Sequence, residues 1–151
     1  MTTPTVLTVT RRFAAPPERV FDAWLDPATA GQFLFATPEG VMEKVAIDPR
    51  VGGGFEIVER RPAGLADHVG RFETIDRPHR IVFLFRATMD GEGGGEDDWT
   101  RVTIEFGRDG DGCALTLTHE MDPQWAAYEH RTVEGWTMIL AKLAETMGDD
   151  R

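Results

Sequence analysis

The sequence predicts an α+β fold in which a curved antiparallel sheet wraps around one long C-terminal helix. Three observations predict it: an alternating segment leads directly into two short helical patterns, a series of strand patterns follows across short turns, and the last segment has apolar residues at helical spacing. Strands joined by short turns pair antiparallel. We therefore expect a sheet of six or seven strands, with two short helices after the first strand.

The N-terminal elements are a strand followed by two helices. Apolar and polar side chains alternate through residues 5–13, as in a strand with one buried face. Pro17 suits the first turn of a helix, and apolar residues up to Trp24 then fall at helical spacing. Pro27 disfavours continuing that helix through Asp26, so a second short helix is predicted over residues 28–33.

The middle of the chain is a run of strands separated by turns rich in Gly, Pro and Asp. We predict strands at residues 41–47, 55–59, 68–76, 80–88, 99–106 and 114–120. Val41, Val45 and Ile47 are expected on one face of the first of these strands. The face of Arg71 stays open, because a bulge near Thr74 could swap the faces of its strand, and the glycines at 52–54 are expected to form a tight turn with positive φ. Residues 90–98 form a predicted glycine-rich hairpin loop.

The C-terminal helix is predicted to begin at Pro123, after an Asp122 cap, and to end at Gly148. Its apolar stripe comprises Trp125, Val133, Trp136, Ile139, Leu140, Leu143 and Met147. Gly135 interrupts this helix at a cost of about 1 kcal/mol relative to Ala. We therefore expect the sheet or a ligand to approach the backbone there.

Size and composition predict one domain over residues 1–151, with its core at about 5–147. The single Cys113 cannot form an internal disulfide, and neither a signal peptide nor a membrane-spanning run is visible, so a reducing cytoplasmic location is expected. The net charge of −10 disfavours nucleic acid and anionic membrane surfaces as partners. The sequence is compatible with a homodimer but does not demand one.

Five segments resemble a known family. They are RFAAP leading into VFDAW (12–24), DPRVGG (48–53), GRF (70–72), P-x-RIVF (78–83), and LTLTHE (115–120) with GW at 135–136. In this order and spacing the chain resembles the activator of heat-shock-protein-ninety ATPase family, within the START-related SRPBCC superfamily. The resemblance implies a helix-grip fold. One departure is Gly31-Gln32-Phe33, where the family usually carries Trp and where related folds have the mouth of a cavity.

A sheet wrapped around a helix can leave an apolar cavity, and the helix-grip resemblance strengthens that expectation. Such sites are concave and mostly apolar, although aromatic residues at these spacings also suit a filled core. The residues expected to bind a ligand are Trp24, Phe33, Phe55, Phe72, Phe83, Phe85, His119, Trp136 and Leu140. Further candidates for the lining are Phe35, Trp99 and Ile139.

His119 is the sharpest polar candidate, because it alternates with Leu115 and Leu117 and should point inward. It is either a core histidine satisfied by partners or a group that meets a ligand. His68 and His79 are expected at the surface. No metal, cofactor or nucleophile motif is visible, so no metal site, catalytic residue or cofactor is predicted.

Three functions remain open from the sequence. The leading one is binding of a hydrophobic or amphipathic small molecule in the central cavity, without an assignable reaction. The second is a protein-interaction role resembling a chaperone-ATPase activator, although the chain has no room for that protein's additional N-terminal domain. The third is an enzyme of cyclase or hydrolase type that uses His119.

Overall fold

The computed structural model describes residues 4–90, 99–123, 127 and 129–148. Its elements, in chain order, are β1 (Thr5–Phe13), α1 (Pro17–Ala23), α2 (Pro27–Phe33), β2 (Val41–Ile47), β3 (Gly54–Arg61), β4 (Gly64–Asp76), β5 (Arg80–Met89), β6 (Thr100–Asp109), β7 (Gly112–Met121) and α3 (Glu129–Thr146). This is the α+β plan predicted from the sequence. The predicted loop over residues 91–98 and Trp125 of the apolar stripe lie outside the described residues.

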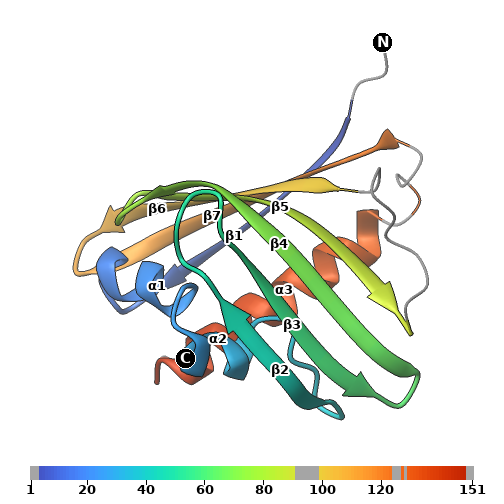
Figure 1. Ribbon diagram of the computed structural model, residues 1–151. Coiled ribbons are helices and arrows are strands. Elements are labelled where there is room, and N and C mark those ends of the chain that lie inside the picture. Colours follow the sequence, from blue (N-terminus) through green and yellow to red (C-terminus); the bar gives the residue numbers. More distant parts are fainter. Residues whose placement is uncertain (1–3, 91–98, 124–126, 128, 149–151) are drawn as a thin grey trace.

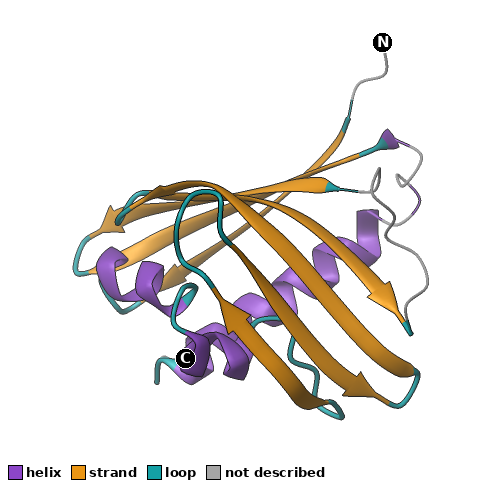
Figure 2. Cartoon of the chain, viewed as in Figure 1, coloured by secondary structure: helices purple, strands orange, loops and turns teal. Residues whose placement is uncertain are grey.

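The described strands form one seven-stranded antiparallel sheet in the order β1-β7-β6-β5-β4-β3-β2. Figure 1 shows the sheet curving around α3, which crosses its concave side. The helices α1 and α2 link β1 to β2, the two edge strands, and lie on the same side of the sheet as α3 (Figure 2). The helix-grip architecture is therefore confirmed.

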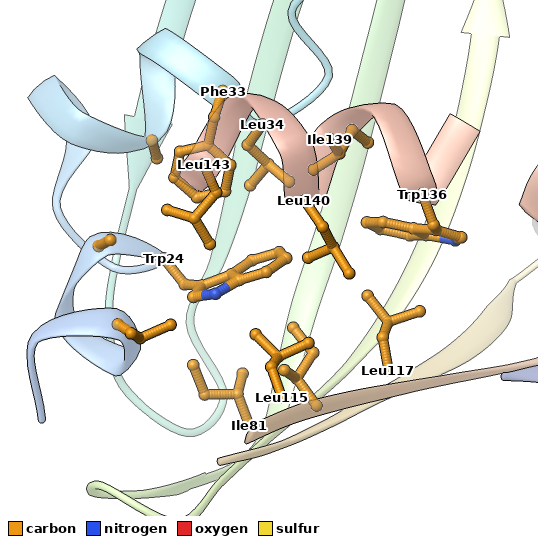
Figure 3. Packing of buried hydrophobic residues seen from close by; sticks show 14 of the residues in the cluster. Trp24, Phe33, Leu34, Ile81, Leu115, Leu117, Trp136, Ile139, Leu140 and Leu143 are labelled. Carbon is orange, nitrogen blue, oxygen red and sulfur yellow. The ribbon is translucent and has the colours of Figure 1, made fainter. Parts of the chain in front are cut away.

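The hydrophobic core lies between the concave face of the sheet and the three helices. Figure 3 shows Trp24 beside Leu140 and Leu143 of α3, with Trp136 further along the same helix. Trp24 and Phe33 pack edge to face, with their ring centroids 5.2 Å apart. Because α2 also contacts α3, one end of the concave face is filled by packed side chains.

Two predictions about irregular backbone are confirmed. The pairing of β4 with β5 shifts register between Phe72 and Thr74, as expected for a bulge near Thr74. Of the three glycines at 52–54, only Gly52 has a positive φ, of +88°, and Gly148 has a φ of +77° just after α3. Both positions favour glycine because a side chain disfavours this region of backbone space.

Two predictions about the elements were wrong. Val41 is 64% exposed rather than on the buried face, because β2 is an edge strand whose pairing with β3 shifts register between Met42 and Lys44. The α-helix begins at Glu129 rather than at Pro123, which lies in a 3₁₀ turn. Turns of that kind are common just before an α-helix.

Candidate functional site

A cavity of about 450 Å³ opens between the concave face of the sheet and the first half of α3. Strands β4, β5 and β7 contribute its floor, while α3, the last residue of β3 and the connection between α2 and β2 contribute its walls. It is lined by Phe35, Ala36, Thr37, Arg61, His68, Phe85, Ala87, His119, Arg131, Thr132, Gly135, Trp136, Met138 and Ile139. Most of these side chains are aromatic or aliphatic, as in sites for apolar small molecules.

Strand alternation carries three of the lining residues to the cavity. On β4 the buried positions are the even-numbered ones, which include His68. The register pairs His68 with Ala87 and Gly70 with Phe85, so His68 and Phe85 are diagonal neighbours on adjacent strands. His119 faces the same space from β7, and Trp136 faces it from α3. Side chains from β4, β5, β7 and α3 thus line the same cavity.

His119 is buried and is bonded through both ring nitrogens. The indole Nε1–H of Trp136 donates to His119 Nδ1 at 3.0 Å. An accepting Nδ1 places the ring proton on Nε2, which lies 2.7 Å from Thr100 Oγ1 and donates to it. The Thr100 hydroxyl in turn donates to the Phe85 carbonyl at 3.1 Å. This chain of donors fixes the neutral tautomer of His119 and the orientation of the Trp136 ring.

His68 is also buried, with 6% of its surface exposed, so its predicted place at the surface was wrong. The strand β4 begins at Gly64, and His68 therefore lies inside the strand rather than at its edge. Its Nδ1 lies 3.1 Å from the Ile57 carbonyl, which can only accept, so Nδ1 carries the proton. Nε2 is therefore left as an acceptor.

Burial lowers the pKa of both histidines from the usual 6.5 to about 4. For His119 the cause is desolvation of the charged ring. For His68 desolvation is the largest cause and the nearby Arg61 adds to it, against the opposing effect of the Ile57 carbonyl. Both rings are therefore neutral near pH 7, and each presents a fixed pattern of donor and acceptor.

Phe35 forms one wall of the cavity from an unusual backbone conformation. Its φ is +59°, in the left-handed region that costs a residue with a side chain about 1–2 kcal/mol. The Arg61 guanidinium holds this turn by donating from Nη2 to the Phe35 carbonyl at 3.0 Å. The ring of Phe35 is consequently held against the sheet by a contact from the end of β3.

The carboxylate of Glu59 anchors the same connection from the interior. Glu59 is 1% exposed and accepts hydrogen bonds from the Thr37 backbone N–H, the Thr37 hydroxyl and Arg61 Nε at 2.8, 3.0 and 2.6 Å. Gly40 leaves room for it, because a Cβ at that position would lie 2.2 Å from the carboxylate. This cluster was not predicted from the sequence, although Glu59 follows Phe55 and Ile57 on the buried face of β3.

The structure separates the nine residues predicted to bind a ligand into two groups. Phe85, His119 and Trp136 line the cavity. The other six, which belong to the packed core, are Trp24, Phe33, Phe55, Phe72, Phe83 and Leu140. Phe35 and Ile139, the further candidates, do line the cavity. Alternation identified the inward face correctly, but it does not show where along that face the space lies.

Trp99, another candidate for the lining, lies on the opposite face of the sheet. The guanidinium groups of Arg71 and Arg86 lie 5.3 and 4.6 Å from its ring centroid. The next residue, Thr100, bonds His119 on the inner face, and alternation therefore directs Trp99 outward. Cation–π contacts of this kind belong to the outer surface of the sheet rather than to the cavity.

The described part of the chain gives little support for a metal site or for a reactive cysteine. There, no group of three or more His, Cys, Asp or Glu side chains could hold a metal ion. Cys113 is fully buried, and burial raises the pKa of its thiol to about 11, which disfavours the reactive thiolate. No helix in the described residues is both long and apolar enough to cross a membrane.

Comparison with known families identifies the chain. The family model described as "Activator of Hsp90 ATPase homolog 1-like protein" matches residues 14–148. The chain belongs to this family. The match spans α1 through α3 and so includes every element that lines the cavity. No curated protein gives a significant match.

Solved structures share the fold of this Hsp90 ATPase activator-like chain. Protein CV1439 from Chromobacterium violaceum is 25% identical with a TM-score of 0.80, and the alignment covers 94% of this chain and 96% of that one. Mll3558 from Rhizobium loti is 26% identical with a TM-score of 0.71, covering 95% and 96%. CalU16 from Micromonospora echinospora, at 20% identity and a TM-score of 0.67, shows the fold alone and covers 95% and 76%.

The segment where this chain departs from the family pattern is not at the cavity mouth. Phe33 is fully buried against Trp24, whereas Phe35, two residues later, lines the cavity. A side chain at Gly31 would press on Val45 at 3.1 Å. The departure therefore affects the packing of α2 on β2.

Gly135 lines the cavity without being required by any close contact. A Cβ at this position would meet nothing within 4 Å, so the expected approach of the sheet to the backbone does not occur. We therefore predict that Gly135→Ala stabilises the protein by about 1 kcal/mol, because Ala is the better helix former. Urea unfolding monitored by circular dichroism would measure this, and a lower midpoint for the variant would contradict it.

Proposed function

We propose that this protein binds an apolar or amphipathic small molecule in the cavity between α3 and the sheet. The single observation that carries the proposal is the cavity itself: about 450 Å³ of space, walled mainly by aromatic and aliphatic side chains, in the part of the fold that the helices leave unfilled. A volume of this size suits a small organic molecule. Burying its apolar surface would contribute roughly 25 cal/mol per Å².

A few polar groups on the walls would orient such a molecule. His68 offers the acceptor Nε2 beside the apolar floor. Arg61 and Arg131 line the same space with positive charge, although Glu59 neutralises that of Arg61. This arrangement favours a ligand that is largely apolar and carries one or two polar substituents.

The geometry favours binding over catalysis by His119. A general base needs an accessible lone pair. The only lone pair on the neutral ring of His119 is occupied by the indole N–H of Trp136, and its proton is directed to Thr100. His119 therefore positions Trp136 and contributes to the floor of the cavity, and we assign it no chemical step.

Filling the cavity tests the proposal. In Gly135→Leu the new side chain enters open space beside Trp136, so binding of cis-parinaric acid, a fluorescent amphipathic chain, should weaken by about tenfold or more. Thr137→Leu adds a similar side chain at an exposed position of α3 that does not line the cavity, and it should bind like the wild type. Equal affinities for all three proteins would overturn the proposal.

The family match supports a second candidate function, stimulation of a chaperone ATPase. This role needs a contact surface rather than a cavity, so the two candidates respond to different variants. Purified Hsp90 mixed with this protein should hydrolyse ATP faster than Hsp90 alone. Gly135→Leu should leave any such stimulation intact, because Gly135 lies in the cavity wall. An unchanged ATPase rate would remove this candidate.

A further inference from the structure

Three rings at the cavity are stacked in two parallel layers. Phe35 lies parallel to His68 within 3° at a centroid distance of 4.2 Å, and parallel to Phe85 within 7° at 5.0 Å. His68 and Phe85 are themselves within 6° of parallel, with centroids 6.1 Å apart. These distances place the His68 and Phe85 rings side by side in one layer, with the Phe35 ring covering both.

This nearly parallel arrangement differs from most of the other ring contacts nearby, although Phe35 and Phe55 also stack, at 28°. Phe83 meets Phe85 at 88°, and Trp136 meets Phe85 at 63°. Edge-to-face pairs and offset stacks both occur in packed aromatic cores. The rings of His68 and Phe85, by contrast, come from adjacent strands of a rigid sheet and form a platform suited to another flat ring.

The ring that now covers this platform comes from the least regular part of the site. Phe35 belongs to the connection between α2 and β2, and its left-handed φ is imposed by Arg61 and the buried Glu59 rather than preferred by the residue. Local strain of this type is relieved when the residue moves. The platform residues, in contrast, are held by strand pairing on both sides.

His68 adds a directional contact beside the platform. Its Nδ1–H is committed to the Ile57 carbonyl, which leaves Nε2 as a fixed acceptor in a ring that lines the cavity. A hydroxyl or N–H that reaches the edge of the ring, in the plane of the ring, would satisfy it. An aliphatic chain without a donor would leave it unpaired, at a cost to affinity.

We propose that the ligand is a planar aromatic molecule, and that it stacks on the His68–Phe85 platform in place of the Phe35 ring. This inference rests on the proposed function, since it names the class of molecule that occupies the same cavity. When no ligand is bound, the Phe35 ring then occupies the stacking position.

The experiment compares two probes of the same carbon skeleton by titration calorimetry. 2-Naphthol is flat and carries one hydroxyl, whereas trans-decahydro-2-naphthol carries the hydroxyl on a puckered, saturated skeleton. The wild type should bind 2-naphthol about tenfold more tightly than the saturated probe, because only the flat ring can stack. Equal affinities, or a preference for the saturated probe, would overturn the proposal even if Phe35→Gly failed to fold.

Phe35→Gly tests displacement directly. Glycine adopts a positive φ without strain, so the variant removes the competing ring while keeping the turn. It should bind 2-naphthol about tenfold more tightly than the wild type, since no ring has to be displaced. Phe33→Leu, in the packed core away from the platform, is the control and should leave the affinity for 2-naphthol unchanged.

The outcomes separate this inference from the proposed function. A wild-type protein that binds cis-parinaric acid but shows no preference for 2-naphthol would overturn the planar ligand and leave the cavity as a binding site. A wild type that binds none of the three probes would overturn both. An affinity of Phe35→Gly for 2-naphthol no higher than that of the wild type would overturn displacement of the Phe35 ring.

Discussion

Lowering the pH from about 6.5 toward 4 should destabilise this protein by several kcal/mol. His68 and His119 have their pKa lowered to about 4 in the folded state, against 6.5 for an ordinary histidine. Between these two pKa values the two histidines are protonated in the unfolded chain but neutral in the folded chain. The free energy of unfolding therefore falls as the pH falls. Each histidine contributes about 3 kcal/mol to this loss.

The physical cause is visible at His119. A protonated ring would turn Nδ1 into a donor facing the indole N–H of Trp136, and that hydrogen bond would be lost. Urea unfolding at intervals between pH 7.5 and 4.5 would measure the effect. Acidic side chains also titrate near the lower end of this range, which makes histidine variants necessary for the assignment.

Two variants test whether the histidines cause the loss of stability at low pH. His68→Phe keeps a flat ring beside Phe35 and removes one titrating group, so it should lose about half of the pH dependence. His79→Gln removes a histidine from the exposed surface and should leave the profile as in the wild type. If the profiles of wild type and His68→Phe coincide, the acid sensitivity comes from other groups.

Removing the Glu59 carboxylate should also cost much of the stability. Glu59→Ala leaves Arg61 without its partner and the Thr37 backbone N–H without its acceptor, inside the fold. Breaking a buried ion pair from one side costs about 3–5 kcal/mol. We expect about 3 kcal/mol, at the low end of that range, because 24% of the Arg61 side chain remains exposed to water.

The matched control is a surface pair with the same chemistry. Glu73 accepts a hydrogen bond from Arg101 at 2.9 Å, with both side chains largely exposed, so Glu73→Ala should cost at most about 1 kcal/mol. Glu59→Gln keeps an acceptor for Thr37 and should fall between the two. Denaturant midpoints decide the outcome: if Glu59→Ala and Glu73→Ala unfold alike, the buried cluster does not stabilise the fold.

The Glu59 cluster connects stability to the site. It holds Thr37 and, through Arg61, the carbonyl of Phe35, so its loss releases the wall of the cavity as well as destabilising the chain. The hydrogen bonds of this cluster thus hold Phe35 in a backbone conformation that it does not prefer. The connection between α2 and β2 therefore places a strained residue in the wall of the cavity.

Much of this architecture follows from the sequence alone, because it depends on local periodicity. Alternation and helical spacing identified the strands and helices of the described chain, and alternation turned Phe83, Phe85 and His119 inward. The order of the motifs indicated the family that the match over residues 14–148 established. Each of these features is a property of a short stretch of chain and its immediate neighbours.

Tertiary structure decided which inward residues border empty space. The six predicted residues that pack in the core and the three that line the cavity have the same periodicity, and only the positions of α2 and α3 over the sheet separate them. His68 and Glu59 likewise became site residues through β3 and β4 pairing and through the α2–β2 connection. A cavity is the volume that packed elements leave between them, and that volume depends on their relative placement rather than on any local pattern.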